Sequence, residues 1–326
     1  MSRSDLVRRR TLLASGVTGA ALLAAYPVYL VTRETATARE IAATPSPHVT
    51  PSASHPARMT GTPGLHGATI TKSAFPHGTT FDQAIKLWES YTGTKIHTFK
   101  VYYARNHFPT VIDDRIKALL DNGIKALLCF KPDFLPTSRG NLDRMQATMK
   151  AYKKAGLEAD VAIWQEPQVN QGHPDAGSFI AAVQYYGPAV RNYYPLVYDA
   201  SGAAGPTGWV QYYPGDPYVD KVVVDFYGHH YVTGERIDAV AALADNALPP
   251  KPFGLWEMGD RSSHVDTPTP SEMTAYFAYI QSFFTNRLEQ GKTNADITWY
   301  NHGVSAIKSK TDFRIPLWRN LVNATS

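Results

Sequence analysis

The feature that most constrains the fold is an alternation, repeated eight times after residue 65, of a short apolar run with a longer amphipathic one. Near-continuous apolar runs, such as Val-Val-Val-Asp-Phe at 222–226, are typical of parallel strands that are covered on both faces. Eight strands that alternate with helices predict a single (β/α)8 TIM barrel, an α/β fold, rather than an open doubly wound sheet. The expected strands span residues 67–72, 96–103, 125–130, 158–164, 196–200, 221–226, 253–256 and 296–300.

Helix start and stop signals between the strands support this order. The predicted helices are 81–91 (capping box of Thr80 and Gln83), one between Thr110 and Asn122-Gly123, 145–155 (ended by Gly156) and 273–288 (begun by Pro270).

The first 38 residues have the pattern of an export signal. Three arginines at 8–10 are followed by an apolar stretch over 11–31 and by Ala36-Thr37-Ala38, a small-residue cleavage pattern. The run Arg-Arg-Thr-Leu-Leu at 9–13 resembles the twin-arginine export signal, which implies a bacterial protein that is exported folded. Because the apolar stretch has 21 residues, it is also long enough to span a bilayer, and an uncleaved membrane anchor is the alternative.

Residues 39–64 are expected to be a disordered linker. Pro, Ser, Thr, Ala and His dominate this segment, which therefore cannot bury enough apolar surface to offset the entropy of ordering. We expect three parts: an export signal over 1–38, the linker over 39–64 and a barrel domain over 65–326. The barrel is expected to be secreted or held at the cell surface.

The charge and the single cysteine exclude several classes of function. Residues 1–38 supply +3 of the formal net charge of +4, and no Lys/Arg run follows the first ten residues, so nucleic acid is not an expected partner. Cys129 is the one cysteine, which excludes an internal disulfide and metal sites built from paired cysteines. It lies in the apolar run 126–130, where we expect a small buried hydrophobic residue rather than a nucleophile.

Two glutamates lie at the carboxyl ends of predicted strands, where TIM barrels carry their chemistry. Glu166 follows the fourth strand in the run Trp-Gln-Glu-Pro at 164–167, and Glu257 follows Trp256 at the end of the seventh. Strands four and seven face each other across the barrel mouth, so the two carboxyl groups can bracket a sugar. Glycoside cleavage needs such a pair, because one carboxyl protonates the leaving oxygen and, in retaining enzymes, the other attacks the anomeric carbon.

These residues resemble those of a known family. A glutamate in a Trp-x-Glu-Pro setting after strand four, with a second ending strand seven, resembles the pattern of the clan A glycoside hydrolases. The run Tyr-Tyr-Pro-Gly-Asp-Pro-Tyr-Val-Asp at 212–220, which leads into Val-Val-Val-Asp-Phe-Tyr at 222–227, is similar to the segment before strand six in family 26, the β-mannanase family. The likeness covers residues 66–320 in architecture, and close motif identity is limited to this segment and the two glutamates.

The resemblance implies roles for four residues. Glu166 would be the acid/base and Glu257 the nucleophile, and Tyr227 at the end of strand six would hydrogen-bond and orient the nucleophile. Trp299 on strand eight would be the aromatic platform under the sugar. Gln165 departs from the pattern, because clan members carry Asn there to hold the sugar 2-hydroxyl and family 26 carries His. The departure bears on the identity of the sugar more than on the reaction.

Other side chains near the glutamates are candidates for sugar binding. Trp164 and Trp256 precede them in the sequence, and His229 and Tyr231 follow Tyr227 in a polar cluster. A metal ion is not expected, because adjacent histidines point apart on an extended chain and no spaced carboxylate completes a ligand set. Asp225 is expected to hydrogen-bond inside the barrel. Further candidates for the cleft lining are Tyr102, Tyr103 and Arg105.

The sequence therefore predicts an exported retaining glycosidase that acts on a β-linked glycan, a mannan or another wall polysaccharide, without a cofactor. Its expected partners are the polysaccharide and the export machinery. No G-x-S-x-G elbow, Walker loop, dinucleotide-binding G-x-G-x-x-G or H-E-x-x-H motif occurs in the sequence. Two alternatives stay open: a carbohydrate-binding barrel without turnover, which the Gln165 departure favours, and a membrane-anchored envelope interaction protein that uses the barrel as a scaffold.

Overall fold

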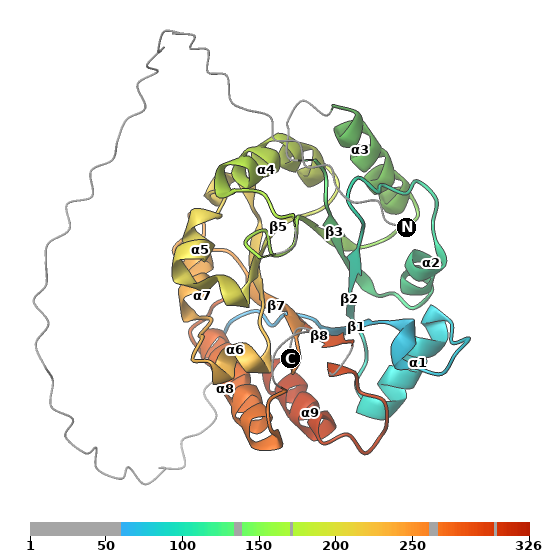
Figure 1. The fold of residues 1–326 in the computed structure, drawn as a ribbon, viewed down its shortest axis with the longest axis vertical. Helices are drawn as coiled ribbons and strands as arrows, with labels where there is room; N and C mark the ends of the chain where they lie inside the picture. Colours follow the sequence, from blue (N-terminus) through green and yellow to red (C-terminus); the bar gives the residue numbers. More distant parts are fainter. Residues whose placement is uncertain (1–59, 134–138, 170–171, 261–266, 303–304) are drawn as a thin grey trace, which may run out of the picture. The chain divides into compact units, whose positions relative to one another are not determined.

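The chain folds into a closed eight-stranded parallel barrel (Figure 1), as the sequence predicts. The computed structural model describes residues 60–133, 139–169, 172–260, 267–302 and 305–326. Each strand pairs in parallel with the next along the chain, and β8 closes the barrel by pairing with β1. The strands are β1 (His66–Ile70), β2 (Thr98–Tyr102), β3 (Lys125–Phe130), β4 (Ala159–Ile163), β5 (Leu196–Ser201), β6 (Lys221–Asp225), β7 (Phe253–Met258) and β8 (Asn294–Asn301).

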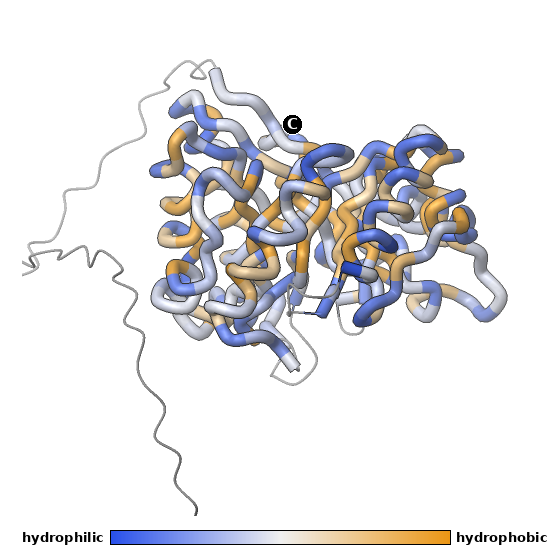
Figure 2. The backbone as a smooth tube through the Cα atoms, turned by 90° about the horizontal axis from the view of Figure 1, so that it is seen from above, coloured by the Kyte–Doolittle hydropathy of each residue, from blue (hydrophilic) through white to orange (hydrophobic). Residues whose placement is uncertain are grey.

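Helices surround the barrel in chain order, and Figure 1 shows them as an outer ring. The α-helices of the described residues are α1 (Phe81–Thr92), α2 (Asp114–Asp121), α3 (Arg139–Lys154), α4 (Ala176–Arg191), α5 (Gly205–Gln211), α6 (Gly228–Val232), α7 (Asp238–Asp245), α8 (Pro270–Glu289) and α9 (Arg314–Thr325). Because each helix runs back against its strand, the helix N-termini lie at the mouth formed by the carboxyl ends of the strands. Figure 2 shows the hydrophobic residues concentrated in the strands and along the helices that cover them.

Local sequence explains where several helices begin. The capping box at Thr80 is confirmed, because the Thr80 hydroxyl accepts the Gln83 backbone N–H and the Gln83 side chain accepts that of Thr80. The helix predicted between Thr110 and Asn122-Gly123 is confirmed as α2, whose C-cap is Asn122. The N-cap of α2 is Asp113, whose carboxylate accepts the backbone N–H of Ile116 at 2.8 Å.

The barrel interior has three layers along its axis, two polar and one apolar. Near the amino ends of the strands lies an ion cluster in which Lys125 contacts Asp160 at 2.6 Å and Asp296 at 2.7 Å. Above it is an apolar layer, with Trp256 as its largest side chain, and near the carboxyl ends lies a second polar layer. The apolar layer consists of Leu127, Cys129, Ala162, Val197, Val223, Trp256 and Ala295. Cys129 is thus a buried core residue, as expected.

The ordered chain begins earlier than predicted. The backbone N–H of Gly61 donates to Leu288 O at 2.8 Å, and that of Asn294 donates to Thr62 O at 2.9 Å. The end of the predicted linker, residues 60–62, is thus hydrogen-bonded to α8 and β8. Composition did not reveal this, because the bonds are made by the backbone.

The predicted export signal over 1–38 lies outside the described residues, as does the linker up to residue 59. In the part of the chain that the structure describes, no helix combines the length and hydropathy needed to cross a bilayer.

Close packing of β1 against β2 leads to a stability prediction. A Cβ on Gly67 would lie 1.9 Å from the backbone oxygen of Thr98, which cannot move without disturbing the barrel. We expect Gly67→Ala to lower the free energy of unfolding by about 1–3 kcal/mol in urea titrations. Gly140→Ala is the control, because Gly140 lies in α3 with open space around it and Ala favours helix. Equal stability of the two variants would contradict the prediction.

Candidate active site

Glu166 and Glu257 lie at the carboxyl ends of β4 and β7, at the barrel mouth. Glu166 is the third residue after β4, and its backbone N–H donates to Asp199 O at 3.0 Å, which ties it to β5. Its carboxylate also has a hydrogen bond with the Ser201 side chain. Glu257 lies within β7 and is buried.

The backbone is strained where it presents Glu166. Trp164 and Glu166 have φ angles of 57° and 46°, in the left-handed region that non-glycine residues rarely occupy. Each such residue costs on the order of 1–3 kcal/mol and persists only where its surroundings enforce it. Here the Trp164 N–H donates to Phe130 O and its indole Nε1 donates to Pro132 O, both at 2.7 Å. These bonds fix the turn that points Glu166 away from the strand.

Both carboxylate oxygens of Glu257 are held by donors. The Tyr102 hydroxyl donates to Oε1 and the Tyr227 hydroxyl donates to Oε2. The Lys100 ammonium lies 2.8 Å from Oε1. The Tyr227 contact is the one that the family resemblance implied. Tyr102, a secondary candidate in the sequence, is the matching donor on the other side.

The two glutamates have opposite pKa shifts. Burial, followed by the charge of Glu257, raises the pKa of Glu166 to about 7. Burial also acts to raise the pKa of Glu257, but the Lys100 charge and the hydrogen bonds from Lys100, Tyr102 and Tyr227 outweigh it and leave this pKa below its usual value. Near neutral pH the site therefore pairs a carboxyl group that can carry a proton with an ionised carboxylate.

An irregularity in β7 explains how two consecutive side chains reach the barrel interior. Val224 of β6 pairs with Leu255, but the next residue, Asp225, pairs with Glu257, so Trp256 is an extra residue in β7. Trp256 packs into the apolar layer while Glu257 reaches the polar layer above it. The prediction that Trp256 binds substrate is wrong, because its side chain is 0% exposed.

Trp299 is also misassigned. It is 0% exposed, stacks on Phe277 of α8 with ring centroids 5.7 Å apart, and donates from Nε1 to Ser305 O. The next residue, Tyr300, is half-buried and makes edge-to-face contacts with Tyr102 and Tyr227, at 6.4 and 6.1 Å. Side chains alternate along a strand, so Tyr300 and not Trp299 is the aromatic residue of β8 beside Glu257.

Trp164 and Gln165 lie near Glu166 but are largely covered. Trp164 is 3% and Gln165 is 7% exposed. The Lys131 ammonium, beyond the end of β3, lies 5.4 Å from the centre of the Trp164 ring. Both side chains can therefore offer a substrate only a small exposed surface.

The histidine pair lies on a short helix rather than on extended chain. His229 and His230 belong to α6, and their ring centroids are 3.9 Å apart, so the expectation that they point apart is wrong. Burial and the neighbouring His229 lower the pKa of His230 to about 3. His229 is half-buried and its ring stacks beside that of Tyr227 at 5.9 Å.

Tyr231 does not face the glutamates. Its ring stacks on Tyr279 of α8 at 5.3 Å, and the Arg236 guanidinium covers it at 4.4 Å. The prediction that Tyr231 binds substrate is therefore wrong, because its ring packs between Tyr279 and Arg236 instead.

Sequence reasoning missed Lys100 and Asp199. Lys100 lies on β2 and Asp199 on β5, both fully buried, and they contact each other at 2.8 Å. The expected inward role of Asp225 is confirmed, because both of its carboxylate oxygens accept from Lys100, at 2.9 and 2.8 Å. A charged residue at the inward position of a predicted strand was the signal available for each.

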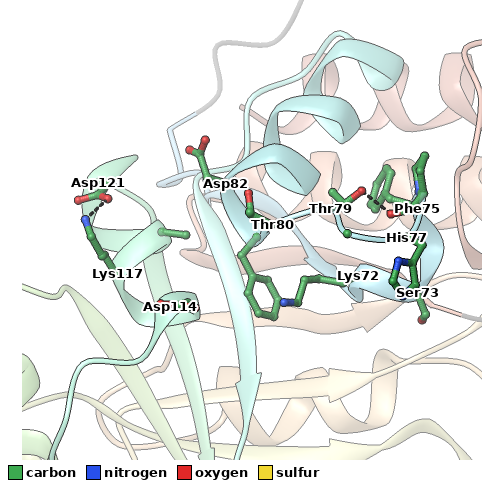
Figure 3. A pocket seen from close by; sticks show the side chains of 14 residues that line it. Lys72, Ser73, Phe75, His77, Thr79, Thr80, Asp82, Asp114, Lys117 and Asp121 are labelled. Carbon is green, nitrogen blue, oxygen red and sulfur yellow. Dashed lines mark hydrogen bonds and ion pairs between the residues drawn. The ribbon is translucent and has the colours of Figure 1, made fainter.

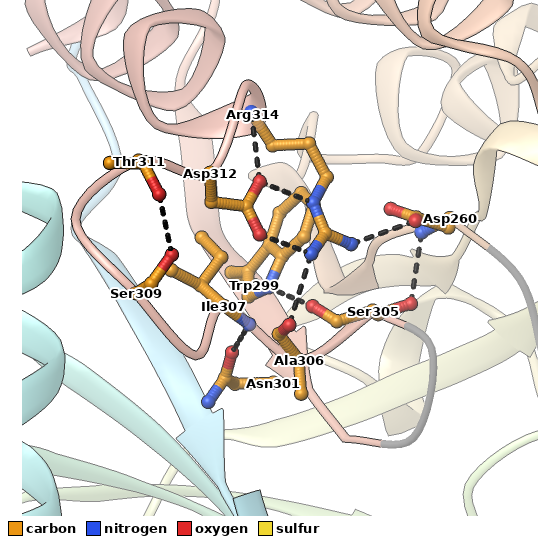
Figure 4. Close-up of polar contacts among 10 residues, drawn as sticks. All are labelled: Asp260, Trp299, Asn301, Ser305, Ala306, Ile307, Ser309, Thr311, Asp312 and Arg314. Carbon is orange, nitrogen blue, oxygen red and sulfur yellow. Dashed lines mark hydrogen bonds and ion pairs between the residues drawn. The ribbon is translucent and has the colours of Figure 1, made fainter.

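A buried guanidinium joins the chain after β7 to the chain after β8 (Figure 4). Arg314 of α9 contacts Asp260 at 2.7 Å and Asp312 at 2.6 Å, and donates to Ala306 O at 3.0 Å. The backbone N–H of Asp260 donates to Ser305 Oγ at 2.9 Å. This cluster holds the residues that follow Glu257 against those that follow Tyr300.

A separate pocket of about 890 Å³ lies beside α1 and α2 (Figure 3). Its lining includes Phe75, Phe81, Asp82 and Lys117 and none of the predicted site residues. The Lys72 ammonium lies 4.7 Å from the centre of the Phe81 ring.

The interaction between the glutamates leads to a prediction. Since the Glu257 charge helps to raise the pKa of Glu166, Glu257→Gln should lower that pKa from about 7 toward the ordinary carboxyl value. Titration of the side-chain carboxyl carbons by NMR, with Glu166→Gln to assign the signal, would measure it. Glu158→Gln is the control, because Glu158 is exposed at the other end of β4. An unchanged pKa in Glu257→Gln would mean that the two carboxyl groups do not interact.

Comparison with known proteins shows the fold. No family model and no curated protein matches the chain. Among solved structures, GH26C from a Muricauda species is 12% identical over 81% of this chain and 86% of its own, with a TM-score of 0.51. A family 30 xylanase from Clostridium acetobutylicum (12%, 74% and 64%, TM-score 0.46) and a GH10 xylanase from Thermobacillus composti (13%, 80% and 96%, TM-score 0.47) also match. These neighbours are glycoside hydrolases, and the likeness to GH26C, at 12% identity, shows the barrel fold alone.

Proposed function

We propose that the protein is a retaining glycoside hydrolase in which Glu166 is the acid/base and Glu257 the nucleophile. The observation that carries the proposal is the pair of carboxyl groups at one barrel mouth with opposite pKa shifts, about 7 for Glu166 and below the usual value for Glu257. Two carboxyl groups whose environments separate their pKa values are what acid and nucleophile assignments require.

In the proposed first step, a Glu257 oxygen attacks the anomeric carbon as the bond to the leaving oxygen breaks. Glu166 gives its proton to that oxygen, and a glycosyl ester forms on Glu257. In the second step Glu166, now ionised, takes a proton from water while the water oxygen attacks the same carbon and releases Glu257. Tyr102 and Tyr227 hold the nucleophile in place through both steps, because each donates to one of its oxygens.

The proposed substrate is a β-linked glycan, a mannan or another wall polysaccharide. Support comes from the sequence likeness at 212–227 and from the half-buried rings of Tyr300 and His229 beside Tyr227, since such rings suit sugar faces. Gln165 reaches one methylene further than the asparagine of the clan, so we propose a different contact with the 2-hydroxyl. Export by the twin-arginine route is part of the proposal and rests on residues 1–38.

The first test is activity of the barrel, residues 60–326, on a panel of dyed β-glycans and aryl β-glycosides. We expect turnover by the wild type and a loss of about a thousandfold or more in Glu166→Gln and Glu257→Gln, because each removes one half of the pair. Activity should fall as the pH rises through about 7, where Glu166 loses its proton. Glu158→Gln should match the wild type.

Two outcomes would contradict the proposal. Full activity in either active-site variant would exclude the assigned roles. Tight glycan binding without turnover on any substrate would favour the carbohydrate-binding barrel instead.

The assignment of Tyr300, in place of Trp299, as the aromatic residue beside Glu257 gives a second prediction. Tyr300→Ala should raise KM by about tenfold, equivalent to about 1.4 kcal/mol, with a small change in stability, because Tyr300 is half-buried at the mouth. Trp299→Phe should instead lower the free energy of unfolding by about 1–3 kcal/mol with KM unchanged, because Trp299 packs against α8. Steady-state kinetics and urea unfolding of both variants would measure the split. The reverse pattern would restore Trp299 as the platform.

A further inference from the structure

A single ammonium group inside the barrel contacts three carboxyl groups. Lys100 Nζ lies 2.8 Å from Asp199 Oδ2, from Asp225 Oδ2 and from Glu257 Oε1. The side chains of Lys100, Asp199 and Asp225 are 0% exposed, so water does not share in this arrangement. An ammonium has three N–H donors and no acceptor, which matches the three carboxyl groups around it.

The charges of this cluster do not balance if all three acids are ionised. One positive charge would then face three negative charges in a dry interior, where each uncompensated ion costs several kcal/mol. Asp199 and Asp225 contact the same ammonium nitrogen from the neighbouring strands β5 and β6. Because two negative charges at one buried site disfavour each other, a proton on one of the two carboxyl groups relieves their repulsion.

We propose that Asp199 and Asp225 share one proton, and that the charge of Lys100 is thereby available to Glu257, which makes Lys100 a positioning residue for the nucleophile. The proposal deepens the function given above and rests on it where it concerns the nucleophile. Burial supports the assignment of the proton, because it raises the pKa of Asp225 well above its usual value and that of Asp199 to about 6.

The proton-sharing pair is part of the scaffold rather than of the reacting atoms. Asp199 and Asp225 lie on the neighbouring strands β5 and β6, and Lys100 reaches them from β2. The titratable and charged groups that surround Lys100 and Glu257 are Tyr102 (β2), Cys129 and Lys131 (β3 and after), Glu166 (after β4), Asp199 (β5), Asp225 and Tyr227 (β6 and after) and Tyr300 (β8). Lys100 contacts the carboxyl groups of Asp199, Asp225 and Glu257.

The shared proton can be tested by replacing Asp199, Asp225 or both with asparagine and comparing the charge that remains in each variant. An Asn side chain has one donor and one acceptor face, as a protonated carboxyl group has. In Asp199→Asn or Asp225→Asn the remaining aspartate is expected to be ionised, so either single variant keeps the one negative charge of the pair. The double variant removes that charge.

The basic limb of the kcat/KM profile follows the loss of the proton from Glu166. Its position therefore reports the negative charge of the Asp199 and Asp225 pair, which acts on the pKa of Glu166. We expect each single variant to leave this limb near pH 7 and the double variant to move it to lower pH, since a lost negative charge disfavours the protonated form of Glu166. Lys100→Met should move both limbs to higher pH and lower kcat by about a hundredfold, with KM little changed. Lys100→Arg should keep the limbs in place, and Glu158→Gln serves as the external control.

Three results would overturn the proposal. A shift of the basic limb in each single asparagine variant, about half as large as in the double variant, would mean that both aspartates are ionised. Unmoved limbs in a folded Lys100→Met protein would leave Lys100 a purely structural role. If Lys100→Arg shifted the pH limbs and lowered kcat as Lys100→Met does, the positive charge of Lys100 would not be the cause of these changes.

An infrared measurement tests the proton without any turnover. The full chain, held well above pH 7 so that Glu166 is ionised, should show the carbonyl band of a protonated carboxylic acid, and Asp199→Asn/Asp225→Asn should lack it. A wild type without the band would overturn the shared proton even if the protein is an active glycosidase. A wild type with the band but without turnover on any glycan would overturn the proposed function and leave the shared proton in place.

Discussion

The contact between Lys100 and Glu257 is the interaction on which the site depends. It joins β2 to β7 across the barrel at 2.8 Å, with the Lys100 side chain 0% and the Glu257 side chain 6% exposed. Removing one partner of such a pair costs on the order of 3–5 kcal/mol, because the other charge stays buried. The barrel must therefore be closed before Glu257 can be ionised at low cost, and an ionised Glu257 in turn helps to keep Glu166 protonated. Fold and chemistry are thus linked through one lysine side chain.

Most of the fold could be read from the sequence, because apolar runs of strand length are long enough to average out local exceptions. The predicted and observed bounds of β3 are identical, and those of the other strands differ by one or two residues. The two glutamates were found for a related reason, since a charged residue directly after an apolar strand marks a strand end. Their environment was missed, because Lys100 and Asp199 reach the site from strands that are distant in the sequence, and a charged residue within a strand does not say which partner it meets.

The errors within the site have local physical causes. Trp299 and Tyr300 differ by one residue, and a strand turns successive side chains to opposite faces, so an error of one position exchanges core for cleft. Asp296 and Thr298 share the face of Tyr300, and this alternation in β8 is a signal that the prediction of Trp299 did not use. Trp256 was misread because of the extra residue in β7, and the residues of α6 because five residues are too few to show a helical period.

The Arg314 cluster has a consequence for how this barrel could acquire a new specificity. One guanidinium fixes Asp260 behind β7 and Ala306 behind β8, while the backbone N–H of His229 in α6 donates to Asp260 O at 3.0 Å. The segments after β7 and after β8 and the helix α6 are therefore joined in one hydrogen-bond network. Grafting a foreign segment at one of them would leave buried hydrogen-bonding groups of the other two without partners. Recombination, natural or engineered, would then succeed only when the chain from β6 to α9 is inherited as a single block.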